Sequence, residues 1–156
     1  MQFPKKIIPL SLLAVCFGYI EAMVVVYLRR TVPLSMWEQA TSYRQLIALL
    51  NTTGIMWSEQ TREFSTIVIL VCLAFLFGED RRQRWGAFLI AFGLWDIFYY
   101  VFLFIWLRWP ESLMTWDVLF LIPAPWIAPV IVPVVISAGM IGTGLFLVRN
   151  HKDERR

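Results

Sequence analysis

The stretch GLWDIFYY at residues 93–100 places an acidic side chain inside a long apolar run, which extends over residues 85–107. Apolar runs of 18 or more residues are typical of transmembrane helices. Asp96 lies at the centre of this run, where a carboxylate costs about 2.5–3.5 kcal/mol on insertion scales. We therefore expect Asp96 to face protein or trapped water and to have a hydrogen-bonding or ionic partner.

The composition extends this reading to the whole chain. The 156 residues are 59% hydrophobic, whereas a soluble domain is about half apolar, and the apolar residues lie in long runs. These runs predict membrane spans at about residues 7–27, 59–77, 85–107 and 128–148. The predicted fold is all-α: a polytopic membrane protein with four transmembrane helices in a single domain covering residues 1–156.

Two segments outside the spans have their own patterns. Ser35 and Glu38 form a capping box, and one apolar stripe follows over residues 36–50. We expect an amphipathic helix there, lying on the outer leaflet or roofing the bundle; a substrate-gating lid is the alternative. Near the C-terminus, prolines crowd residues 123–133 and remove backbone donors. They predict a short half-helix at 118–122 and a proline-rich elbow at 123–129 that other parts of the protein bury.

Lysine and arginine residues are unevenly distributed between the two sides of the membrane that the predicted spans define. With four spans, nine of the 14 basic residues fall on the side of the termini and five on the other side. The positive-inside rule therefore places both termini in the cytoplasm. Because the basic residues cluster at the ends of apolar runs, the net charge of +3 does not indicate nucleic-acid binding.

Cysteine and histidine are sparse. Cys16 and Cys72 lie in predicted spans and form no CxxC motif, so we expect buried free thiols. His151, the single histidine, lies in the polar C-terminal tail. A haem or zinc site in the membrane is therefore not expected. The sequence identifies no other cofactor, and any metal would be a hard cation held by oxygen ligands.

Acidic residues in the spans, and one in the segment before the last span, suggest one site. Glu21, Glu63 and Asp117 fall in the outer half of the predicted bundle and Asp96 near the middle, so we expect them to converge on one polar cavity. The candidate catalytic residues are Asp96, Glu21 and Asp117. The candidate ligand-binding residues are Glu63, Arg62, Tyr100, Trp95 and Trp116; Tyr100 lies four residues after Asp96 and can share its helix face.

Structural roles are the alternatives. Asp117 could lie in the first turn of a helix capped by Thr115, where the helix dipole favours a carboxylate. Asp96 could pair with a tyrosine or a buried backbone donor. Glu63 could form an interfacial salt bridge with one of three arginines: Arg29, Arg30 and Arg62.

Several motifs together resemble a known group of proteins. They are FGYIEA (17–22), RE (62–63), FGLWDIFYY (92–100), WPESL (109–113) and LIPAPW (121–126). The chain resembles a family of uncharacterised bacterial four-helix inner-membrane proteins. The resemblance implies a location in the bacterial inner (cytoplasmic) membrane and brings no activity with it. The size is also similar to that of lipoprotein signal peptidase, but the motifs of that aspartic protease are absent.

Three functions stay open at this level. The first is a small membrane enzyme, or a lipid- or ligand-binding protein, that uses the carboxylates at the outer leaflet. The second is an ion- or proton-coupled pathway in an oligomer, with Asp96 and Glu21 relaying charge. The third is an accessory structural subunit of a larger membrane complex. The expected partners are membrane lipids, with other membrane subunits or self-association as further options.

Overall fold

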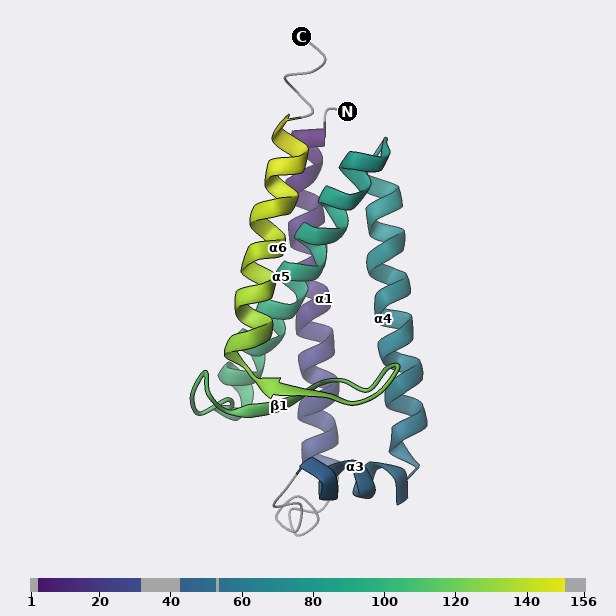
Figure 1. The fold of residues 1–156 in the computed structure, drawn as a ribbon, viewed down its shortest axis with the longest axis vertical. Helices are drawn as coiled ribbons and strands as arrows, with labels where there is room; N and C mark the ends of the chain where they lie inside the picture. The colour runs from purple at the N-terminus through teal and green to yellow at the C-terminus, as the bar shows by residue number, and fades with distance from the viewer. Residues whose placement is uncertain (1–2, 32–42, 53, 151–156) are drawn as a thin grey trace.

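The computed structural model describes residues 3–31, 43–52 and 54–150 of the chain (Figure 1). These residues are mostly helical, with a two-stranded sheet between the last two helices. The elements in chain order are α1 (Phe3–Thr31), α3 (Tyr43–Thr52), α4 (Ile55–Phe77), α5 (Arg81–Leu107), β1 (Trp116–Phe120), β2 (Trp126–Pro129) and α6 (Ile131–Asn150).

Within the described residues, four helices are long and apolar enough to cross a membrane, as predicted. The candidate spans are Lys6–Arg30, Ile55–Phe77, Arg81–Leu107 and Ile131–Arg149. The second span starts earlier than predicted: α4 begins at Ile55, directly after Gly54, whose φ of 74° is left-handed. Ser58 therefore lies inside the first turn of α4, where its hydroxyl donates a hydrogen bond to the carbonyl oxygen of Ile55 at 2.8 Å.

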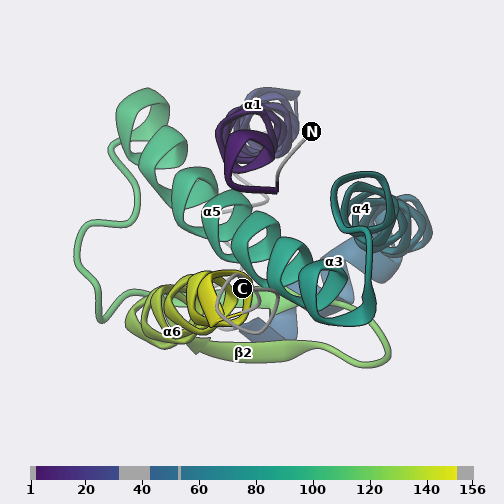
Figure 2. The same ribbon diagram turned by 90° about the horizontal axis from the view of Figure 1, so that it is seen from above.

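The helix that carries Asp96, α5, lies at the centre of the bundle. It packs against α1, α4 and α6, and Figure 2 shows it crossing between them. A Cβ added to Gly93 would lie 2.5 Å from the carbonyl oxygen of Ser137 in α6, and one added to Gly18 would lie 2.7 Å from that of Trp95. Since real Cβ atoms do not come that close, α1 and α6 reach α5 only because these positions have no side chain.

The segment between α5 and α6 is a β-hairpin, so the all-α prediction is wrong there. β1 pairs antiparallel with β2, with Trp116 opposite Pro129 and Val118 opposite Ile127. The half-helix predicted at 118–122 is therefore not formed. The bend at 123–125 is non-helical, as predicted, but it is exposed and not buried. β-branched residues in both strands and a proline at the end of β2 favour this pairing over a helix.

The two ends of the bundle differ. The start of α1, the turn between α4 and α5, and the end of α6 lie at one end, and α3 lies across the other end (Figure 1). The described helix α3 covers only the second half of the amphipathic helix predicted at 36–50. The capping box at 35–38 lies outside the described residues.

The prediction of buried thiols is wrong, because Cys16 and Cys72 are both free and exposed. Each lies on a face of its helix that no other described element covers. An apolar side chain at such a position contacts lipid in a membrane-spanning helix, so it does not have to be buried in protein.

Candidate functional site

A polar pocket of about 60 Å³ lies where α1, α4, α5 and β1 meet. Its charged lining residues are Glu21, Glu63, Asp96, Asp117 and Arg62. The four carboxyl groups come from four different elements and line one pocket. The position of this pocket in the outer half of the bundle stays a prediction. The roles of the carboxyl groups in catalysis or ligand binding also stay predictions.

The carboxylate of Glu21 is almost fully buried, and Arg62 of α4 neutralises its charge. It accepts hydrogen bonds from the guanidinium of Arg62 and from the hydroxyl of Thr66. Arg62 also contacts Glu59 one turn earlier, with its Nη2 2.6 Å from Oε2 of Glu59. One arginine thus serves two carboxylates and ties α4 to α1.

Glu63 is also buried, but its partner is not one of the arginines expected from the sequence. Among the described residues it forms no ion pair with Arg62, because consecutive residues of a helix point in different directions. Its Oε2 instead accepts a hydrogen bond from the backbone N–H of Leu121 at 2.8 Å. Gln60 of the same helix donates to the carbonyl oxygen of Leu121 at 3.3 Å. These two bonds hold the hairpin against α4.

Asp96 has its partner on α6. Its Oδ2 accepts a hydrogen bond from the hydroxyl of Ser137 at 2.7 Å, and both residues are buried. The partner expected from the sequence was a tyrosine or a backbone donor. Gly93 lies three residues before Asp96, on the same face of α5, and its close contact with α6 brings the serine within reach.

Asp117 lies in β1 and not in the first turn of a helix, so that alternative is wrong. Tyr100 Oη donates a hydrogen bond to Asp117 Oδ2 at 2.9 Å, and the N–H of Val118 donates to Oδ1 at 2.9 Å. Burial raises the pKa of Asp117 to about 6, although both hydrogen bonds act in the opposite direction. The Asp117 carboxyl therefore titrates close to neutral pH.

The two candidate tryptophans have different positions. Trp95 lines the pocket and is buried, and its indole N–H has no acceptor among the described residues. Trp116 is 62% exposed and is not part of the pocket wall.

Sequence reasoning missed other parts of the site. Tyr99 and Phe120 line the pocket, and Ser137 supports Asp96. Tyr99 lies three residues after Asp96, so helical spacing was a usable signal. No comparable signal marks Phe120 or Ser137, since their positions depend on the hairpin and on the contact between α5 and α6.

Among the described residues, no group of three His, Cys, Asp or Glu side chains could hold a metal ion. The part of the chain that the structure describes is mostly helical and has four helices of membrane-spanning length and composition. Comparison with family models, curated proteins and solved structures finds no match to this chain.

Proposed function

We propose that the protein binds the primary ammonium group of a small ligand or lipid headgroup in the polar pocket. The supporting observation is the charge of the lining, to which the described residues contribute four carboxyl groups and one arginine. Carboxylates this close cannot all stay ionised unless cations neutralise them. A primary ammonium supplies one positive charge and three hydrogen-bond donors in a compact group.

The size of the pocket supports a small group over a large ligand. Pockets for drug-sized molecules have volumes of roughly 300–1,000 Å³, whereas this one has about 60 Å³. A primary ammonium fits such a space, and a trimethylated ammonium, which also lacks N–H donors, fits poorly. Asp117, with a pKa of about 6, is mostly ionised at neutral pH and can there pair with the positive charge of the bound group.

We also propose that this is a multi-pass protein of a bacterial inner membrane, with both termini in the cytoplasm and the pocket in the outer half. The nine-to-five distribution of basic residues supports this orientation. Helix α3 would then lie along the outer surface of the membrane, across the end of the bundle.

The test uses the full chain in detergent micelles. Ethylammonium chloride should raise the midpoint temperature of unfolding by about 2–4 °C relative to tetramethylammonium chloride at equal ionic strength. Asp96→Asn should remove most of this difference, because it keeps the acceptor for Ser137 but removes the charge. Glu111→Gln is the matched control, since Glu111 is exposed and lies outside the pocket.

The pH dependence gives a second readout of the same proposal. The effect of ethylammonium should grow as the pH rises through about 6, because Asp117 then becomes ionised. Asp117→Asn should flatten this dependence. Equal stabilisation by the two cations, in the native chain and in both pocket variants, would contradict the proposal and favour a structural subunit.

A further inference from the structure

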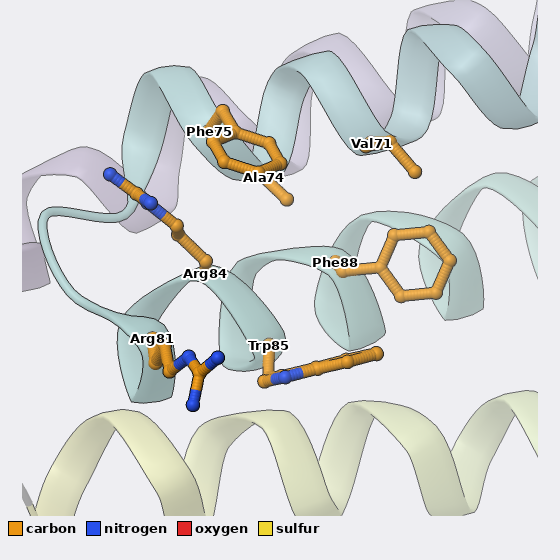
Figure 3. A pocket seen from close by; sticks show the side chains of 7 residues that line it. All are labelled: Val71, Ala74, Phe75, Arg81, Arg84, Trp85 and Phe88. Atoms are coloured by element: carbon orange, nitrogen blue, oxygen red, sulfur yellow. The ribbon is translucent and has the colours of Figure 1, made fainter.

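A second cavity, an apolar groove of about 400 Å³, lies between α4 and α5 next to the turn that joins them (Figure 3). Apolar side chains form its walls, and arginines from the first turn of α5 lie at its end. The lining residues are Val71, Ala74, Phe75, Arg81, Arg84, Trp85 and Phe88. The groove is separate from the polar pocket, since the two share no lining residue.

The turn holds one of these arginines in place. The guanidinium of Arg84 lies over the ring of Phe75, 4.7 Å from its centroid, and its Nε donates to the carbonyl oxygen of Gly78 at 3.2 Å. A Cβ on Gly78 would come within 2.5 Å of the backbone nitrogen of Arg84, so the tight turn requires glycine. The arginine is thus preorganised beside an apolar surface.

The acidic residues of the turn are engaged elsewhere. Glu79 forms an ion pair with Lys6 of α1 at 3.0 Å, and the carboxylate of Asp80 accepts the N–H of Gln83 as the cap of α5. Across the described chain, no carboxylate forms an ion pair with Arg81 or Arg84. The end of the groove therefore carries positive charge that a bound anion can neutralise.

We propose that this groove binds one anionic phospholipid, with an acyl chain against the apolar walls and the phosphate at Arg81 and Arg84. The planar guanidinium fork matches phosphate oxygens, and basic pockets between transmembrane helices recognise acidic headgroups. Trp85 is 62% exposed beside these arginines, a position typical of the boundary between headgroups and acyl chains. A soluble phosphate would leave the apolar walls uncovered, which favours a lipid.

The experiment is native mass spectrometry of the full chain from micelles that contain equal amounts of phosphatidylglycerol and phosphatidylcholine. The native protein should retain one phosphatidylglycerol molecule in preference to phosphatidylcholine. Arg81→Gln/Arg84→Gln should weaken that binding about 30-fold and leave phosphatidylcholine unaffected. Arg82→Gln/Arg149→Gln is the matched control, because it removes one charge from the first turn of α5 and one from the last turn of α6, and neither residue lines the groove.

A second variant tests the apolar part of the site. Val71→Trp should fill the groove and reduce phosphatidylglycerol retention while both arginines stay in place; Val71 is 39% exposed, so a larger side chain has room. Three results would each overturn the proposal. They are equal retention of the two lipids by the native chain, equal losses in the double variant and its control, and undiminished binding in Val71→Trp.

Discussion

The buried carboxylates of the polar pocket depend mostly on partners from other elements of the fold. Glu21 is buried and depends on Arg62 and Thr66, which are more than 40 residues away. The depth of Asp96 predicts that it needs a partner, but depth does not identify Ser137, because that contact exists only once α5 and α6 are packed. The residue types of the site were thus predictable from the sequence, and most of their pairings were not.

The ion pair between Arg62 and Glu21 leads to a prediction about stability. Arg62→Leu should lower the free energy of unfolding by about 3 kcal/mol, since it leaves a buried carboxylate without its cation. Combining it with Glu21→Gln should recover part of the loss. Denaturant unfolding in micelles measures both effects.

The matched control for this pair is Lys6→Gln, which breaks the ion pair with Glu79. Glu79 is 56% exposed in its side chain, so the loss should stay below about 1 kcal/mol. Additive effects of Arg62→Leu and Glu21→Gln, with no recovery, would contradict a coupled buried pair.

The element that differs most from the sequence-based prediction is the hairpin of β1 and β2. The prolines at 123–133 correctly indicated that no continuous helix runs through this segment. Antiparallel pairing of residues 116–120 with 126–129 depends on contacts across a bend, and neither helical periodicity nor proline content encodes such contacts. Glu63 stabilises the hairpin through Leu121, so a residue predicted for ligand binding also positions an element.

The packing of α5 against α6 gives a prediction for two glycines. Gly93→Ala should destabilise the protein by about 1–3 kcal/mol, because its Cβ would lie 2.5 Å from the backbone oxygen of Ser137 and force the helices apart. Gly139→Ala is the control, since its added Cβ would have no described residue within 4 Å apart from its neighbours in the same helix. That change should be neutral or slightly stabilising.

Thermal unfolding of the two glycine variants in the same micelles provides the measurement. The separation of α5 and α6 in Gly93→Ala should also weaken the hydrogen bond between Ser137 and Asp96, so ethylammonium should stabilise this variant less than the native chain. Equal stability of the two variants would show that the close approach of the helices is not required.

For the whole molecule, hydropathy predicted the four long helices because a span depends on length and composition alone. The central position of α5 and the separation of a polar pocket from a charged apolar groove depend on how the helices pack, which hydropathy does not describe. These two sites make the orientation in the membrane important. With both termini in the cytoplasm, as proposed, the groove beside the turn between α4 and α5 would lie at the inner leaflet and the polar pocket in the outer half.

The orientation can be tested with reporters that are active only in the periplasm. A fusion after Arg149 should be inactive and a fusion after Glu111 active, because nine basic residues lie on the side of the termini and five on the other. Replacing Arg81, Arg82 and Arg84 with glutamine leaves six basic residues on the side of the termini against five on the other side. A mixture of orientations should then appear. Replacing Arg29, Arg30 and Arg108 with glutamine is the control. It leaves nine basic residues on the side of the termini and two on the other side, so a single orientation should remain. Strong periplasmic activity after Arg149 in the native sequence would place the groove at the outer leaflet and contradict the topology.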